Sequence, residues 1–205
     1  MVLFSSVRLL LFTCLLLAAP AVLAARTILV FGDSLSAGYG IPQEAAWPSL
    51  LAKRLQERKL DYSVVNASIS GETTSGGRTR LQDALDKHSP GIVIIALGSN
   101  DGLRGLPIAT MRENLLAMTE TAQQRKARVL IVGQRLPPNY GPYANQFHQV
   151  FGEIAKNRKT AFVEFLLEGV ALTPSLFQSD NLHPTAAAQP RLLDNVWRGL
   201  EPLLK

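Results

Sequence analysis

Cysteine is almost absent from this 205-residue chain: its one copy, Cys14, lies in an apolar run near the N-terminus. Residues 25–205 therefore contain no thiol that could form a disulfide, bind a metal or act as a nucleophile. Histidine is scarce too, with three copies, so there are few candidates for a catalytic base. A single His–Asp pair offers too few ligands for a zinc site, and we expect no metal and no other cofactor.

Concentrated positive charge is also missing. The formal net charge is +5, or +4 without Arg8, and the basic residues are interspersed with acidic and polar ones. The chain therefore lacks the basic stripe with interleaved aromatic residues that nucleic-acid binding requires. A mild positive charge still permits weak, transient attraction to anionic lipid surfaces. We expect a monomer with no nucleic-acid partner.

The first 24 residues differ from the rest and are typical of a secretory signal peptide. Arg8 precedes an apolar run that ends at Pro20, and small residues flank a cleavage site after Ala24. The run is shorter than the roughly 20 apolar residues of a membrane-spanning helix, which disfavours a retained anchor. We expect a signal peptide over residues 1–24, one domain over residues 25–205, and a periplasmic or secreted location.

Short apolar runs alternate with amphipathic segments along the remaining chain. The sequence predicts strands at residues 27–31, 62–66, 91–97, 128–133 and 161–165. It predicts helices at residues 47–59, 74–87, 107–126, 143–157 and 184–204, the last with a bend at Pro190. This alternation indicates a three-layer α/β/α sandwich with a five-stranded parallel sheet, as in flavodoxin-like folds. Ligands of such folds lie beyond the carboxyl ends of the strands, so the loops there should carry the chemistry.

The loop after the first expected strand, FGDSLSAGYG, is rich in glycine but fits neither common phosphate-binding pattern. A P-loop needs a lysine after its last glycine, where this chain has Ile41. A dinucleotide-binding loop needs a third glycine where this chain has Gln43. The loop either presents Ser34 as a nucleophile or forms an ordinary turn. We expect Asp33 to support the loop.

Three further segments contain groups that would complement a serine nucleophile. Gly71, in NASISGETTSGG, either directs its N–H at an anion or belongs to a turn before the next helix. Asn100, in LGSNDGLRG, either donates its amide to a developing oxyanion or braces its loop. In SDNLHP, Asp180 precedes His183 by one helical turn of chain, close enough to orient the ring of a catalytic base.

Together these segments resemble the GDSL hydrolases, and among them the SGNH group of serine esterases. The four blocks GDSLSAGYG, SGET, GSND and DNLHP occur in the family's order. The segments NDGLRG and RLPPNYG are similar to the bacterial periplasmic thioesterase I/lysophospholipase/arylesterase subfamily. One departure is Ser99, where many relatives have a second glycine. The resemblance covers the whole chain after the signal peptide.

The resemblance implies a role for each of these residues. Ser34 would attack an acyl carbonyl, His183 would take its proton, and Asp180 would orient His183. The oxyanion hole would consist of the N–H groups of Ser34 and Gly71 and the side-chain amide of Asn100, which suits the charge that develops in acyl transfer. An apolar acyl channel would be lined by Leu103, Leu106, Leu136 and Pro138, unless these residues simply pack under the loops.

The expected function is hydrolysis of carboxylic esters and thioesters, among them fatty acyl esters, lysophospholipids, acyl-CoA and aryl esters. A carbohydrate O-deacetylase is the alternative within enzymes, although few aromatic residues lie near the site to stack on sugars. An inactive binding module is the third alternative. Such a module has no chemical need for the complete set of Ser34, Gly71, Asn100, Asp180 and His183.

Overall fold

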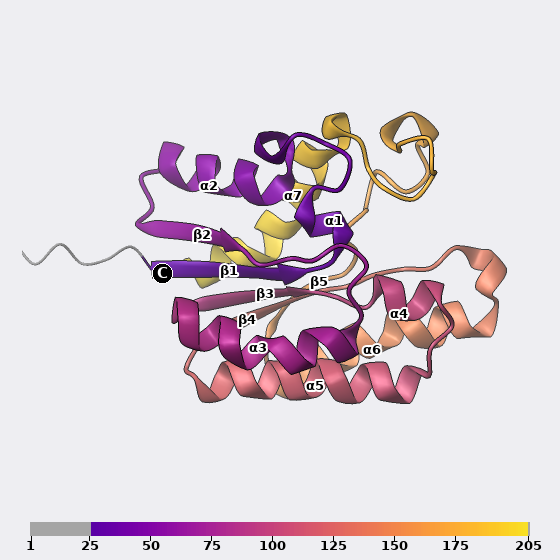
Figure 1. The fold of residues 1–205 in the computed structure, drawn as a ribbon, viewed down its shortest axis with the longest axis horizontal. Helices are drawn as coiled ribbons and strands as arrows, with labels where there is room; N and C mark the ends of the chain where they lie inside the picture. Colours follow the sequence, from indigo (N-terminus) through magenta and orange to yellow (C-terminus); the bar gives the residue numbers. More distant parts are fainter. Residues whose placement is uncertain (1–25, 205) are drawn as a thin grey trace, which may run out of the picture.

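Five parallel strands form the central sheet in the computed structural model, which describes residues 26–204 (Figure 1). The strands are β1 (Arg26–Gly32), β2 (Tyr62–Asn66), β3 (Ile92–Ala96), β4 (Arg128–Val132) and β5 (Ala161–Val163). Their order in the sheet is β2-β1-β3-β4-β5, and every neighbouring pair is parallel. The predicted fold class is therefore confirmed. The predicted signal peptide lies outside the described residues.

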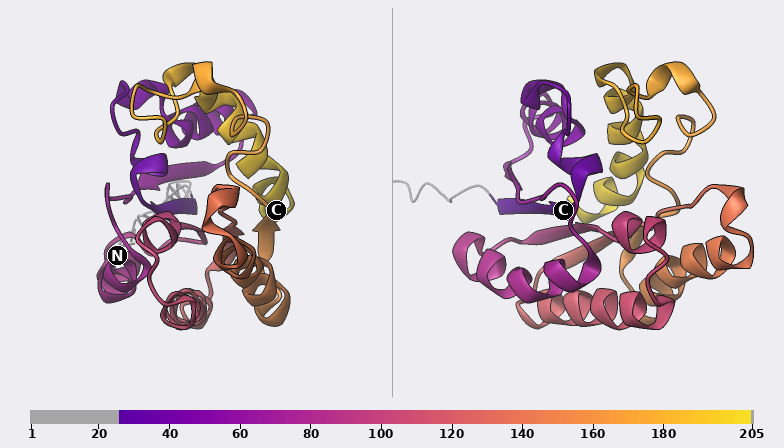
Figure 2. Two further views of the ribbon diagram at one scale, coloured as in Figure 1. Left: turned by 90° about the vertical axis from the view of Figure 1, so that its right-hand side faces the viewer. Right: turned by 45° about the vertical axis from the view of Figure 1, so that its right-hand side comes forward.

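Helices cover both faces of the sheet (Figures 1 and 2). One face carries α2 (Trp47–Glu57) and α7 (Gln189–Leu200), and the other carries α3 (Thr74–His88), α5 (Ile108–Gln124) and α6 (Pro142–Arg158). The short helices α1 (Ser34–Ala37) and α4 (Ser99–Leu103) follow the carboxyl ends of β1 and β3. None of the helices in residues 26–204 is long and apolar enough to cross a lipid bilayer.

Alternate side chains of the central strands enter two separate cores. In β1, Ile28 and Val30 pack with α2 and α7, whereas Leu29 and Phe31 pack with α3, α5 and α6. Because both faces are buried, these strands are apolar throughout, as parallel strands between two helical layers must be. This double burial is why the strands were recognisable in the sequence.

Most predicted boundaries lie within two residues of those in the structure, and two of the differences have a clear structural cause. The fifth strand ends at Val163, two residues earlier than expected. After Val163 the chain leaves the line of the strand and crosses the end of β4, where the Leu166 N–H donates to the Gly133 carbonyl. Pro190 does not bend the last helix but lies in its first turn. A proline fits there because the N–H that it lacks would have no partner within the helix.

Candidate active site

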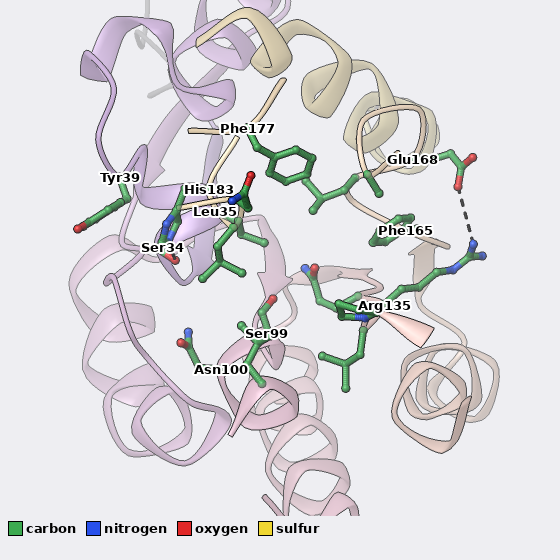
Figure 3. A pocket seen from close by; sticks show the side chains of 18 of the residues that line it. Ser34, Leu35, Tyr39, Ser99, Asn100, Arg135, Phe165, Glu168, Phe177 and His183 are labelled. Carbon is green, nitrogen blue, oxygen red and sulfur yellow. Dashed lines mark hydrogen bonds and ion pairs between the residues drawn. The ribbon is translucent and has the colours of Figure 1, made fainter. Parts of the chain in front are cut away.

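A cleft of about 870 Å³ opens at the carboxyl ends of the strands. β2 and β3 lie on opposite sides of β1, so the chain changes direction across the sheet at this point, where parallel α/β folds commonly bind ligands. The cleft brings together Ser34, Gly71, Asn100 and His183, which come from four different segments of the chain. Figure 3 shows the side chains of Ser34, Asn100 and His183.

Ser34 is the first residue of α1, directly after β1. The Asp33 side chain caps this helix by accepting a hydrogen bond from the Leu35 N–H at 3.0 Å. Gly38 ends the helix at φ 76°, a left-handed conformation that glycine adopts without steric cost. The glycine-rich loop therefore makes a tight single turn that presents Ser34 at the end of the strand.

His183 connects Ser34 to Asp180 in one row of hydrogen bonds. The distance from Ser34 Oγ to His183 Nε2 is 2.9 Å, and that from His183 Nδ1 to Asp180 Oδ2 is 2.7 Å. Asn181 adopts φ 54°, which curls the chain so that Asp180 reaches back to the ring. Sequence reasoning predicted this grouping, and the structure brings the three side chains together.

Asp180 is held in its charged form. Its pKa is lowered to about 2, first by the backbone N–H of His183, then by the His183 ring and the backbone N–H of Leu182. Asp180 is therefore ionised throughout the neutral pH range. A carboxylate that accepts the Nδ1–H fixes the tautomer in which Nε2 is free to take the serine proton.

Gly71 and Asn100 supply two candidate amide donors in the lining of the cleft that contains Ser34. Gly71 adopts φ 79°, and its carbonyl accepts a hydrogen bond from Arg104 at 3.0 Å. Asn100, the second residue of α4, donates one amide N–H to the Glu72 carbonyl at 2.9 Å. This bond fixes the side-chain amide at the cleft wall and leaves its second N–H for a ligand. The geometry suits an oxyanion hole.

Two buried aspartates support these loops in different ways. Asp101 accepts hydrogen bonds from both the backbone N–H and the hydroxyl of Thr74, at 2.8 and 2.6 Å, and so braces α4 against α3. Asp33 is less well compensated, because its Oδ2 has no hydrogen-bond partner among residues 26–204. Burial raises the pKa of Asp33 to about 7, although the Leu35 N–H opposes this shift. The expected supporting role of Asp33 agrees with its position as a helix cap.

The structure adds two residues that sequence reasoning missed. The Tyr39 ring lies 4.4 Å from the His183 ring, measured between centroids, and partly covers it. Gln178 Nε2 donates to the Tyr39 carbonyl at 2.8 Å and to the Pro184 carbonyl at 3.1 Å. Gln178 thus ties the loop of the serine to the loop of the histidine. Its position just before the DNLHP block was the one available clue.

Apolar side chains form much of the remaining cleft wall. Leu103, Leu136 and Pro138 line the cleft, as predicted for an acyl channel. Leu106 lies outside the lining, because the chain turns away at Gly105, which has φ 62°. The opposite wall comes from residues 165–173, and Figure 3 shows Phe165 beside Arg135, which forms an ion pair with Glu168. Among residues 26–204, no cluster of three potential metal ligands occurs.

This fold and this row of side chains define a serine hydrolase of the α/β class. The chain belongs to the GDSL-like lipase/acylhydrolase family, whose pattern it matches over residues 30–190. It is 50% identical over 182 residues to the esterase TesA of Pseudomonas aeruginosa, covering 88% of this chain and 90% of that protein. A crystal structure of TesA superimposes with a TM-score of 0.85 at 50% identity, covering 87% of this chain and all of that one.

A second relative has a broader set of names. The Escherichia coli K12 protein called thioesterase 1/protease 1/lysophospholipase L1 is 40% identical over 182 residues, which cover 88% of this chain and 86% of that protein. The predicted resemblance to GDSL hydrolases of the thioesterase I/lysophospholipase/arylesterase type is thus confirmed.

Proposed function

We propose that this chain hydrolyses carboxylic esters and thioesters of fatty acids through an acyl-enzyme on Ser34, as a monomer acting after export from the cytoplasm. The observation that carries the proposal is the continuous row from Ser34 through His183 to Asp180 at the mouth of a largely apolar cleft. The relatives named for esterase, thioesterase and lysophospholipase activities point to the same substrate classes.

In the first step Ser34 Oγ attacks the acyl carbonyl while its proton passes to His183 Nε2. Asp180 stabilises the imidazolium that forms, because its carboxylate remains charged at neutral pH. Negative charge develops on the carbonyl oxygen and is stabilised by the N–H groups of Ser34 and Gly71 and by the Asn100 amide.

In the second half of the reaction, the alcohol or thiol leaves with the proton from His183. His183 then takes a proton from water, and the hydroxide oxygen attacks the acyl-enzyme on Ser34. The same oxyanion donors stabilise this second tetrahedral intermediate. It collapses when the bond between Ser34 Oγ and the acyl carbon breaks, His183 returns its proton to Ser34 Oγ, and the carboxylic acid leaves. No cofactor takes part in either half of the proposed reaction.

The test is hydrolysis of p-nitrophenyl esters of two to sixteen acyl carbons, together with a fatty acyl thioester. We expect activity that extends to medium and long chains and falls by at least about 10⁴-fold in Ser34→Ala, the size of loss known for serine nucleophiles. Equal activity in that variant would remove Ser34 from the mechanism. Activity on acetyl esters alone would favour a carbohydrate deacetylase, and no activity on any ester would favour a binding module.

A further inference from the structure

Every exposed large hydrophobic side chain of residues 26–204 lies in the cleft lining or within three residues of it in the sequence. Tyr39 is 52% exposed, Leu182 42% and Leu172 97%, and all three line the cleft. Ile69 is 50% exposed and immediately precedes two lining residues, and Leu106 is 36% exposed in the turn after α4. We call this set the apolar rim: Tyr39, Ile69, Leu106, Leu172 and Leu182.

The rim is not explained by the packing of the fold. Single exposed hydrophobic residues are normal, but a group around one opening marks an interaction site. Leu172 in particular buries almost none of its surface, so it contributes little to the core. Ile69 and Leu106 do not line the cleft, so contact with a bound substrate does not account for them either.

Two arginines without an ion-pair partner in the described part of the chain lie near the rim, and the charged Asp180, two residues from Leu182, offsets part of their charge. Arg104 donates to the Gly71 carbonyl, and the Arg191 side chain lies against Gly169 in the cleft wall. Neither arginine has an ion-pair partner within residues 26–204, whereas Arg135 is paired with Glu164 and Glu168. Glu168 is the one carboxylate in the described lining of the cleft, and Arg135 already compensates it.

We propose that the apolar rim docks on the surface of a phospholipid bilayer that contains anionic lipids, so that an acyl chain passes from the bilayer into the cleft. This inference rests on the proposed acylhydrolase function. Leucine and isoleucine side chains would enter the boundary between headgroups and acyl chains, while Arg104 and Arg191 would contact lipid phosphates.

The position of the rim favours a lipid surface over a protein partner. Three rim residues, Tyr39, Leu172 and Leu182, line the cleft through which any substrate must reach Ser34. A second copy of the chain seated there would close the cleft. A bilayer would cover the same apolar side chains and at the same time supply an acyl chain.

Sedimentation with phosphatidylcholine/phosphatidylglycerol vesicles tests the proposal, using protein that begins at Ala25 so that the first 24 residues cannot contribute. The main variant is the double substitution Ile69→Ser/Leu106→Ser, outside the cleft lining. We expect vesicle binding about tenfold weaker or more, because each isoleucine or leucine loses its apolar contact with the lipid. Hydrolysis of vesicle-borne esters should fall in parallel, while kcat/KM for a soluble short-chain ester stays within about twofold.

A pair of charge variants tests the electrostatic part. Arg191→Gln should weaken binding to the anionic vesicles by about fivefold at low salt, the effect typical of one basic residue near such a surface. Lys87→Gln removes the same charge from the last turn of α3, at the amino ends of the strands, and should leave binding unchanged. Leu172→Ser, at a side chain too exposed to affect folding, should also weaken vesicle binding.

The proposal fails if the wild-type protein does not sediment with vesicles, or if the rim variants bind as well as wild type. It also fails if the rim instead holds two copies together, which would appear as a dimer that the rim variants dissociate. Ser34→Ala must bind vesicles as tightly as wild type. Rim-dependent binding without any ester hydrolysis would overturn the proposed function and leave the docking surface, so the two failures are distinguishable.

Discussion

The two halves of the cleft are held in place by different kinds of interaction. The catalytic half contains Ser34, Gly71, Asn100 and His183, and the acyl half is formed by residues 134–138 and 165–173. In the catalytic half, side chains bond to backbone atoms. Asn100 donates to the Glu72 carbonyl of another loop, Asp180 accepts from two N–H groups of its own loop, and Gln178 donates to one carbonyl of its own loop and one of the serine loop.

The acyl half combines one buried anchor with several partly exposed side-chain pairs. The anchor is Asn195, whose Nδ2 donates to the Leu166 and Glu168 carbonyls at 2.9 and 2.8 Å. Arg135 reaches Glu164 at 3.3 Å and Glu168 at 3.9 Å, and His148 joins the Gln134 carbonyl at 3.1 Å to Glu164 at 2.7 Å. Exposed ion pairs contribute little free energy and are screened by salt. We infer that the catalytic half is the more rigid one and that the part of the acyl half held by these exposed pairs, around Arg135, can adjust to different chains.

Asn100→Ala is the substitution in the catalytic half from which we expect the largest loss of activity. Removing one oxyanion donor should lower kcat by about two orders of magnitude, with KM little changed, because the lost hydrogen bond forms fully in the transition state. Steady-state kinetics with one p-nitrophenyl ester measure the effect, and circular dichroism checks the fold. An unchanged kcat in a folded variant would remove Asn100 from the mechanism.

Gln178→Ala should have a smaller effect, because Gln178 positions His183 without touching the substrate. Losing the bridge between the Tyr39 and Pro184 carbonyls should loosen the histidine loop and lower kcat by about tenfold, again with KM little changed. Gln43→Ala is the matched control, since Gln43 donates to the Ala37 carbonyl at 2.8 Å within the serine loop and does not reach the histidine. Equal losses in both variants would refute a specific role for the bridge.

The sequence predicted more of the catalytic half than of its supports. Ser34, Asp180 and His183 lie in short motifs whose residue types already indicate their chemistry. The bridge from Gln178 to Tyr39 joins residues 139 positions apart, and no local pattern marks it. Glutamine and tyrosine are ordinary loop residues until the two loops fold together.

The acyl half was predicted less well because its residues lie where regular structure ends. The pattern AFVEF shows an apolar run but not the turn over Gly133 that ends β5 at Val163. Leu103 and Leu106 look equivalent in the sequence, and Gly105, between them, turns Leu106 away from the cleft. Hydrophobic periodicity in the sequence indicates strands and helices, whereas the shape of a cleft wall made of loops depends on the backbone conformation of individual residues.

Leu136→Ala tests whether the acyl half sets chain length. Shortening this lining residue should lower kcat/KM for a long-chain soluble ester by about threefold to tenfold and leave the acetyl ester nearly unchanged, because the long chain loses apolar contact. Leu106→Ala is the control, since its side chain lies outside the lining and should not change the chain-length profile of soluble esters. A uniform loss on all chain lengths in Leu136→Ala would instead assign Leu136 to the catalytic half.

Asp33→Asn should change activity least and stability most visibly, because this carboxyl lies under the catalytic half rather than in it. Its pKa rises from the ordinary 3.8 to about 7 on folding, through burial. The folded state therefore holds the proton more tightly, so the stability that this group contributes is fully present below about pH 4 and is lost as the pH rises through 7, by up to about 4 kcal/mol.

Asparagine keeps an oxygen that can accept the Leu35 N–H, so the helix cap should survive the substitution. Urea unfolding should then show similar stability for both proteins at pH 4 and a more stable variant at pH 8, with kcat/KM at pH 8 within about threefold of wild type. All other titrating groups are the same in both proteins, so the difference between their free energies of unfolding at each pH reports on Asp33 alone. Parallel pH profiles would mean that Asp33 ionises without cost, and the catalytic half would then lack the buried, poorly compensated charge that distinguishes it from the acyl half.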